Sequence, residues 1–291
     1  MCKSESTLSR LFLEERIDPT KLSEFSFASR KIPEFMNHRM VRCLRCDLVY
    51  VESPPSQEVL GKAYHVASYD SAEEANDAAN SYMAAFGPIF NKMPLKESAL
   101  EIGTGTGVLL DLLSRYGFTN VVGVEPSAAA IAAAPESRRE WIREGLFNED
   151  DFEPASLDFI CCLMTMEHVP DPRVIASAAM RLLRPGGAFV TVTHDYGGTV
   201  NRLLGKRSPI IDVEHMQLFS HKSIGYLLEA SGYREIMIKG LVNSYSVGYW
   251  LRLSPLPVRT KMHIRSLLQK LRLHDRKFSM NVGNLVAAGF K

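Results

Sequence analysis

The stretch ALEIGTGTGVLLDLL, residues 99–113, decides the fold. A short apolar run precedes three glycines at alternate positions, and apolar residues at helical spacing follow, which predicts a strand, a turn and an amphipathic helix. Glycine lacks a Cβ, so this backbone can turn sharply and approach a ligand closely. Free N–H groups at the start of the helix favour an anionic group. We therefore expect Gly103, Gly105 and Gly107 to open a binding cleft.

Short apolar runs alternate with segments of helical spacing from residue 99 to the end of the chain. This alternation is typical of a parallel sheet wrapped by helices, so we predict an α/β fold. A helix over residues 71–91 leads into it. The predicted strands are residues 99–102, 121–124, 141–143, 157–164, 188–193, 234–239 and 284–290, and the other predicted helices are residues 108–116, 128–133, 172–183 and 221–230.

The length and charge of the chain limit its organisation and its partners. Its 291 residues exceed one ordinary domain, so we expect a large domain over residues 67–291 and a small N-terminal appendage over residues 1–66. A formal net charge of +1 gives no overall field for polyanions, which argues against nucleic acid as a partner. The sequence has neither a run of about 18 apolar residues nor a signal-peptide core, so we expect a cytoplasmic protein.

An acidic residue, Glu125, lies at the carboxyl end of the predicted strand 121–124. An acid in this place can accept two hydrogen bonds from a ribose diol, as in nucleotide-binding α/β folds. A dinucleotide loop has the spacing G-x-G-x-x-G, whereas here the third glycine falls one place early and Val108 follows it. A nicotinamide-dependent oxidoreductase therefore stays open only as a competing interpretation.

Four segments in this order resemble the motifs of the class I S-adenosylmethionine-dependent methyltransferase family. The resemblance implies a three-layer, Rossmann-like sheet of seven strands with the last strand antiparallel, and S-adenosyl-L-methionine as the cofactor. The closing residues 284–291 resemble the last strand of that fold. The four segments are residues 101–107, residues 121–125, residues 157–164 with 167–170, and residues 184–187 with the strand to 193.

The same resemblance implies which residues hold each part of the cofactor. The glycine loop would hold the methionine part, the acid after the second strand the ribose, and the residues after the third strand the adenine. The end of the fourth strand would face the transferable methyl group. In that order the residues are Glu101, Gly103, Thr104, Gly105 and Gly107, then Glu125 with Pro126, then Leu146 and Phe147, and finally Met164.

Two segments carry candidate catalytic residues. Glu167-His168-Val169-Pro170 resembles a widespread signature, in which His168 contacts substrate, shares a divalent metal with Glu167, or has a structural role as a helix cap or packed under the cleft. Residues 211–220 resemble a segment of small-molecule methyltransferases, some of which use a Glu-His pair to abstract a proton from a sugar. Here the pair is Glu214 and His215, but Asp212-Val213 replace the preceding Tyr-His of those enzymes.

Methyl transfer to a hydroxyl or an acidic C–H is helped by a general base, and histidine titrates near neutral pH. Our first choice is His215, followed by His168 and then His194, while a plain loop histidine remains the alternative for His215. We expect a small-molecule acceptor, and the resemblance suggests a sugar or polysaccharide precursor. A non-catalytic module that binds S-adenosylmethionine is the alternative outside the enzymes.

Residues 251–280 contain eight Lys or Arg residues against one acid, with apolar residues at near-helical spacing. A basic amphipathic segment of this kind can contact a membrane surface or a phosphorylated acceptor. The competing interpretation, which we prefer, is an ordinary packing stripe with a solvated opposite face. The apolar residues are Val258, Met262, Leu267, Leu268 and Leu271.

The N-terminal appendage contains the pair Cys43 and Cys46, in CLRCDLVY, and the single Cys2. This segment resembles the second half of a zinc-ribbon module, and a zinc site of this type needs four ligands. The resemblance therefore implies zinc as a second cofactor, with Cys2, Cys43 and Cys46 as ligands, and we expect the natural chain to begin a few residues earlier with a further cysteine. Ordinary thiols on a hairpin are the alternative.

Overall fold

The computed structural model describes residues 8–23, 25–28, 34–69, 72–254 and 256–291. Its main element is a seven-stranded sheet of order β10-β11-β8-β7-β4-β5-β6. Only β11 runs antiparallel to both of its neighbours, so the predicted sheet with an antiparallel last strand is confirmed. The strands are β4 Ser98–Ile102, β5 Asn120–Glu125, β6 Ile142–Glu144, β7 Leu157–Leu163, β8 Leu183–His194, β10 Arg234–Ser246 and β11 Lys277–Phe290.

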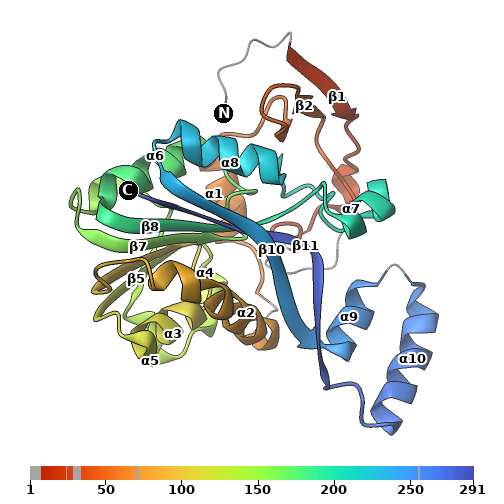
Figure 1. Ribbon diagram of the computed structural model, residues 1–291. Coiled ribbons are helices and arrows are strands. Elements are labelled where there is room, and N and C mark those ends of the chain that lie inside the picture. The colour runs from red at the N-terminus through yellow and green to blue at the C-terminus, as the bar shows by residue number, and fades with distance from the viewer. Residues whose placement is uncertain (1–7, 24, 29–33, 70–71, 255) are drawn as a thin grey trace.

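Helices cover both faces of this sheet, which gives the three layers seen in Figure 1. Neighbouring residues of a central strand face opposite layers: Cys161 packs into the apolar cluster of α2 and α3, and Cys162 into that of α6 and α8. Both faces of the strand are therefore buried, as its apolar run from Phe159 to Leu163 predicts. The helices are α2 Ala72–Phe90, α3 Val108–Tyr116, α4 Ala128–Ala133, α5 Glu136–Arg139, α6 Pro172–Leu182 and α8 His221–Ala230.

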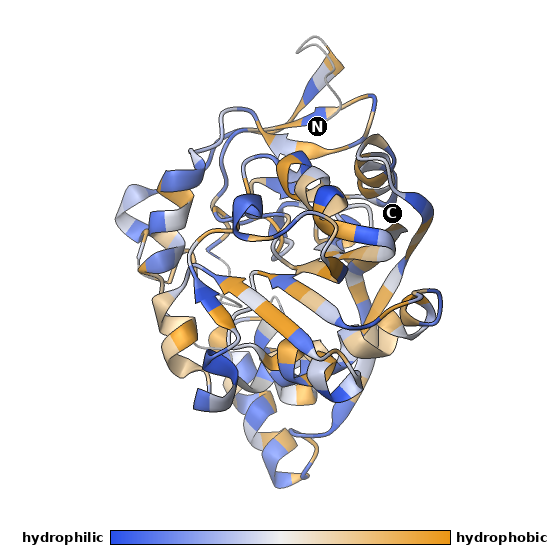
Figure 2. Cartoon of the chain, turned by 90° about the vertical axis from the view of Figure 1, so that its left-hand side faces the viewer, coloured by the Kyte–Doolittle hydropathy of each residue, from blue (hydrophilic) through white to orange (hydrophobic). Residues whose placement is uncertain are grey.

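Apolar residues are concentrated in the central strands, and polar residues cover the outer faces of the surrounding helices (Figure 2). Within the described residues, the structure has no helix long and apolar enough to cross a membrane. Strand β8 pairs irregularly with β7, because Leu157 lies opposite Leu183 and Phe159 opposite Ala188, and the segment Pro185-Gly186-Gly187 lies within this irregularity.

A second, four-stranded sheet has the order β1-β2-β3-β9. Its first three strands come from the N-terminal segment and its fourth from the loop before α8, where Val49 pairs with Leu218. These strands bury a small apolar core of their own, which includes Met40, Val51 and Met216. The strands are β1 Ser9–Leu13, β2 Met40–Cys43, β3 Val49–Val51 and β9 Gln217–Leu218.

Helix α1, Gln57–His65, connects this sheet to the main domain. It begins at Ser56, whose side chain accepts a hydrogen bond from Val59 N and so caps the helix. The helix packs closely against the loop after β6, since a Cβ at Gly61 would lie 2.8 Å from a methyl carbon of Leu146. The N-terminal segment thus contacts the main domain through both a strand and a helix.

Strands β10 and β11 extend well beyond the residues 234–239 and 284–290 predicted for them, and pair as far as Ser246 with Lys277. The ribbon that they form projects from the body of the molecule and carries α9, Val247–Leu253, and α10, Val258–Lys270 (Figure 1). Our preferred interpretation of residues 251–280 as an ordinary packing stripe is wrong for most of its residues. The exposed fractions are 73% for Val258, 65% for Met262, 57% for Leu267 and 57% for Leu271.

Candidate active site

The glycine loop turns from β4 into α3 with positive backbone angles, φ 79° at Gly103, 58° at Gly105 and 68° at Gly107. A side chain at Gly103 would overlap the hydroxyl of Thr165, so this glycine allows close packing of two loops. A Cβ at Gly105 would meet no atom within 4 Å, because this residue faces a cavity. Gly105 is therefore the position where the backbone is open to a ligand.

Two buried acids fasten the loop to the ends of β4 and β5. The carboxylate of Glu125 accepts hydrogen bonds from Gly105 N at 2.7 Å and from Ser127 N at 2.8 Å. Glu101 accepts one from the hydroxyl of Thr104 at 2.6 Å. Burial raises the pKa of Glu125, and the two backbone N–H donors lower it by less. The acid predicted to contact a ribose thus also fixes the backbone of the glycine loop.

One cavity of about 890 Å³ opens at these strand ends. All the residues that we predicted for the cofactor line it except Gly107. Gly107 instead occupies the N-cap position of α3, where a Cβ would lie 3.3 Å from Ile142, so its role is confined to the turn. The residues of the predicted set that line the cavity are Glu101, Gly103, Thr104, Gly105, Glu125, Pro126, Leu146, Phe147 and Met164.

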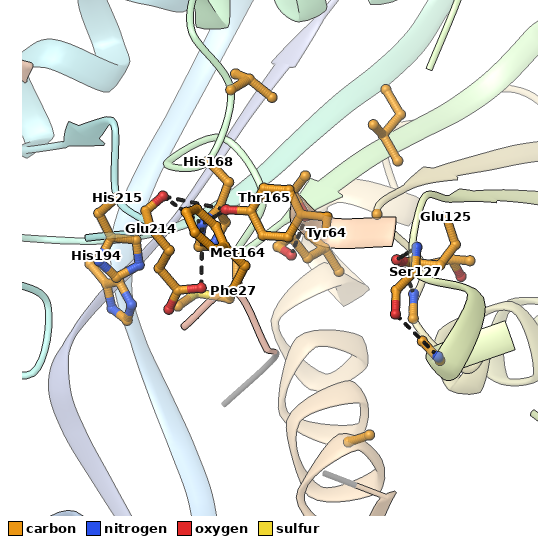
Figure 3. Close-up of a pocket in the computed structure, with 18 of the residues that line it drawn as sticks. Phe27, Tyr64, Glu125, Ser127, Met164, Thr165, His168, His194, Glu214 and His215 are labelled. Carbon is orange, nitrogen blue, oxygen red and sulfur yellow. Dashed lines mark hydrogen bonds and ion pairs between the residues drawn. The ribbon is translucent and has the colours of Figure 1, made fainter. Parts of the chain in front are cut away.

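Met164 follows the last residue of β7 and has a φ of 52°. A positive φ is uncommon for a side chain of this size, and such residues are concentrated at functional sites. Its backbone N–H donates to the carbonyl of Val192 at 2.7 Å, which holds the unusual conformation. In Figure 3, Met164 and Thr165 lie between Glu125 on one side and a group of histidines on the other.

The three histidines that the sequence proposed separately lie next to one another in this cavity (Figure 3). The ring centroids of His168 and His215 are 4.9 Å apart, and those of His194 and His215 are 5.3 Å apart. Glu214 also lines the cavity, with its carboxylate 3.9 Å from Nδ1 of His168. The structure therefore brings all the predicted catalytic residues together.

The protonation of two of these rings follows from their partners. Nδ1 of His215 lies 2.9 Å from the carbonyl oxygen of Ile210, and a carbonyl only accepts, so Nδ1 carries a proton and donates the hydrogen bond. Burial lowers the pKa of His194 to about 4, against a smaller opposing effect of its hydrogen bond with Asn284. His194 is therefore neutral at physiological pH.

Tyr64, which the sequence analysis missed, comes from α1 and reaches the same group. Its hydroxyl oxygen lies 2.9 Å from Nδ1 of His168, and the two rings meet edge to face. Burial raises the pKa of Tyr64 well above its usual value, so the hydroxyl stays protonated. No local motif marks this tyrosine, because its place depends on how α1 packs against the main domain.

Glu167 does not share a site with His168, contrary to one interpretation of the sequence. Its side chain is fully buried outside the cavity, and its carboxylate accepts a hydrogen bond from the backbone of His194 at 2.7 Å. His168 does not cap the following helix, since Asp171 caps α6. Burial raises the pKa of Glu167 to about 7.

The predicted zinc site gains no support from the part of the chain that the structure describes. Cys43 and Cys46 are not joined in a disulfide bond and are 2% and 1% exposed, packed with residues of the α6 and α8 layer. Within the described residues, no three His, Cys, Asp or Glu side chains form a group that could hold a metal ion. Cys2, the third predicted ligand, lies outside the described residues.

Comparison with known proteins agrees with this geometry. A family model described as a methyltransferase domain matches residues 71–236, which is more than half of the chain. The chain therefore belongs to the methyltransferase-domain family, and its fold is that of the S-adenosylmethionine-dependent methyltransferases. The interpretation as a nicotinamide-dependent oxidoreductase is not supported.

Among individual proteins, the chain is 31% identical over 128 residues to the ubiquinone biosynthesis O-methyltransferases of Yersinia pestis and Yersinia pseudotuberculosis. That match covers 42% of this chain and 48% of the relative, so the chain spans about half the length of the curated relatives it matches. An S-adenosylmethionine-dependent methyltransferase from Archaeoglobus fulgidus has a similar structure, with a TM-score of 0.50 and 14% identity over 73% of this chain and 94% of the other.

Proposed function

We propose that this protein transfers the methyl group of S-adenosylmethionine to a hydroxyl or an acidic C–H of a small-molecule acceptor. The observation that carries the proposal is a single cavity that runs from the glycine loop and Glu125 to the three histidines. A module that only binds the cofactor would not need the end of the cavity that contains the histidines. The family supports the cofactor, and the open space at Gly105 fits it.

Residues at one end of the cavity would hold the cofactor. Gly105 presents its backbone at the start of α3, where an anionic group is favoured. Glu125 keeps lone pairs free for the ribose while it accepts its two backbone hydrogen bonds. When bound, the cofactor supplies a methyl group that is already strongly electrophilic. The main task left to the chain is to place an acceptor atom in line with it, at about 3–3.5 Å.

We assign proton removal to His215. Its Nδ1 is fixed as a donor to Ile210, so Nε2 is the ring nitrogen that would receive a proton, and its side chain is only 6% exposed. The acceptor proton would move to Nε2, and the resulting positive charge would lie beside the ring of His168, whose Nδ1 is 3.9 Å from the carboxylate of Glu214. His168, with its Tyr64 partner, and the neutral His194 would position the acceptor.

The acceptor class is a finer proposal. The resemblance of residues 211–220 supports a sugar or polysaccharide precursor, although Asp212-Val213 differ from the Tyr-His of those enzymes. The name of the Yersinia relatives, ubiquinone biosynthesis O-methyltransferase, supports methylation of oxygen.

Binding and turnover measurements test this function separately. Calorimetry should show micromolar binding of S-adenosylhomocysteine and none of NADH. Replacing His215 with Ala should lower the rate of methyl transfer about 10²–10⁴-fold, the usual contribution of a general base, without changing the affinity for S-adenosylhomocysteine. Full activity of His215→Ala would show that another group removes the proton. Binding of S-adenosylhomocysteine by the parent protein without any turnover would favour the non-catalytic module.

A further inference from the structure

The ribbon formed by β10 and β11, together with α9, lines the part of the cavity beyond the histidines. We define these residues as the ribbon subsite: Asn243, Tyr245, Tyr249, Trp250, Met280 and Val282. Asn284 in β11 joins the subsite to the predicted catalytic residues, since its side-chain oxygen lies 2.9 Å from Nδ1 of His194. The subsite is thus continuous with the proposed reaction centre.

Asn243 is a buried polar residue with an unmet hydrogen-bonding requirement. It is 3% exposed, and its side-chain oxygen has no hydrogen-bond partner within the described residues. A buried acceptor of this kind costs free energy unless a partner reaches it, so native structures keep few of them and often at functional sites. The hydrogen-bond partner that Asn243 lacks would therefore come from a ligand in the cavity that its side chain lines.

An irregularity in the ribbon brings this part of the chain to the cavity. Leu241 pairs with Asn284, but Asn243 pairs with Met280, so residues 281–283 of β11 lie opposite Val242 alone. Such bulges redirect side chains and occur often beside active sites. Gly283 takes the required positive φ of 89°.

Aromatic side chains form the rest of the subsite. The ring centroids of Tyr245 and Tyr249 are 4.4 Å apart, and those of Tyr245 and Trp250 are 5.2 Å apart. The indole N–H of Trp250 donates to the carbonyl of Phe278 at 2.9 Å, which fixes the orientation of its ring. Rigid rings of this kind favour a flat aromatic guest.

We propose that the ribbon subsite binds a hydroxylated aromatic ring of the methyl acceptor, with Asn243 hydrogen-bonded to the hydroxyl. A phenolic hydroxyl both donates and accepts, so it satisfies the carboxamide in either of its two orientations. This proposal rests on the proposed function, because it names the acceptor class of the same site. It favours a phenol over a sugar, whose many hydroxyls would need more polar partners than this group of rings provides.

The experiment compares three small probes that separate the ring from the hydroxyl. Phenol carries both, cyclohexanol only the hydroxyl and toluene only the ring. Binding to the full chain saturated with S-adenosylhomocysteine is followed by the indole ¹H–¹⁵N signal of Trp250, which Trp141→Phe assigns because the chain has two tryptophans. Phenol should bind at least fivefold more tightly than either of the other probes.

The variant Asn243→Leu should reduce phenol affinity at least fivefold and leave toluene affinity and S-adenosylhomocysteine affinity unchanged. Its melting temperature should stay the same or rise, because the buried oxygen that it removes has no partner to lose. Val242→Ala is the matched control, since Val242 is adjacent on β10 but 54% exposed and outside the subsite.

Phenol binding unchanged in Asn243→Leu would overturn the proposal, as would tighter binding of N-acetylglucosamine than of phenol. A drop of several degrees in the melting temperature with phenol affinity intact would show a structural role for Asn243 and also overturn it. Failure of the parent protein to bind S-adenosylhomocysteine would instead count against the proposed function.

Discussion

Gly105 and Gly205 both have a positive φ, 58° and 53°, and a Cβ would meet no atom within 4 Å at either of them. Only Gly105 lines the cavity. A valine at either position would be strained, because β-branched residues rarely adopt a positive φ. The pair therefore separates the cost of backbone strain from the loss of space for a ligand.

We expect Gly105→Val to abolish binding of S-adenosylhomocysteine, because the branched side chain would project into the space proposed for the cofactor. Gly205→Val is the control for backbone strain and should lower the melting temperature without affecting affinity. Isothermal calorimetry and thermal unfolding of both variants measure the two effects. Equal affinity in Gly105→Val and the parent would remove the glycine loop from the site.

Glu125→Ala should weaken binding of S-adenosylhomocysteine by about 1.5–3 kcal/mol, the scale of hydrogen bonds to a charged group. Part of this loss would be indirect, because the substitution also frees the N–H groups of Gly105 and Ser127. Glu125→Gln keeps one accepting oxygen and should lose less affinity. An unchanged dissociation constant in both variants would show that Glu125 does not contact the ligand.

Glu167 should make the protein less stable as the pH rises. Burial raises its pKa from 4.5 to about 7, so between these values the folded state holds a proton that the unfolded state has lost. The contribution of this proton to the free energy of unfolding is complete below pH 4.5 and is lost as the pH rises through 7. Glu167→Gln should therefore gain ~2 kcal/mol of unfolding free energy relative to the parent between pH 5 and pH 8.

Urea denaturation of the parent and of Glu167→Gln at both pH values measures this difference. Buried His194, with its pKa of about 4, has the opposite effect between pH 4 and 6.5, so the comparison between the two proteins is more informative than either curve alone. A difference that does not change with pH would mean that Glu167 is already ionised when buried.

At the scale of elements, α10 has no buried residue, although it is part of the ordered ribbon. Its exposed Met262 and Leu267 should tolerate polar substitution, so the double variant Met262→Ser, Leu267→Ser should change the unfolding free energy by only ~0.5 kcal/mol. If these residues and the basic charges around them contact an anionic membrane, the same variant should bind vesicles of phosphatidylcholine and phosphatidylglycerol less tightly.

Vesicle sedimentation at two salt concentrations checks that expectation, with pure phosphatidylcholine vesicles as the control surface. Equal sedimentation of parent and double variant would remove α10 from any membrane contact. A large loss of stability in the variant would indicate that Met262 and Leu267 are covered by another protein surface, such as a second copy of the chain.

Elements with a strong local signal were predictable from the sequence. The glycine loop, Glu125 and the helix at residues 108–116 depend on chemistry within a short stretch, and they lie where expected. The contributions of Tyr64 and Asn243 were not predictable, because both depend on packing between distant segments. Tyr64 reaches the site because α1 packs against the loop after β6, and Asn243 does so because the irregular ribbon reaches the cavity. The extra length of β10 and β11 likewise depends on the pairing of the two strands with each other. Neither strand alone has a sequence periodicity that would predict it.

At the scale of the whole molecule, the N-terminal segment and the main domain share part of their apolar core. Leu48 and Cys46 pack with Phe219 and Ile224 of the α8 region, and all four are nearly inaccessible to solvent. The division of the chain at residue 66 therefore separates residues that are neighbours in space. We propose that residues 1–66 complete the catalytic domain, although the sequence predicts them as an appendage.

Removal of residues 1–66 should therefore abolish methyl transfer and strongly destabilise residues 67–291. The deletion takes away Tyr64, the partner of His168, and the strand that pairs with Leu218, three residues beyond His215. It also exposes the apolar side chains of Met216, Leu218 and Phe219, which are fully buried in the intact chain. At about 1.5–3 kcal/mol for each buried apolar side chain, their exposure alone removes a large share of the 5–15 kcal/mol that stabilises a typical domain.

Circular dichroism and thermal unfolding of the fragment, with S-adenosylhomocysteine calorimetry beside them, measure the outcome. The variant Tyr64→Phe in the full chain isolates the catalytic part of the effect: it should fold with an unchanged melting temperature and bind S-adenosylhomocysteine normally, yet turn over more slowly. A fragment of residues 67–291 that melts at the temperature of the intact chain would show that the N-terminal segment is an independent appendage after all.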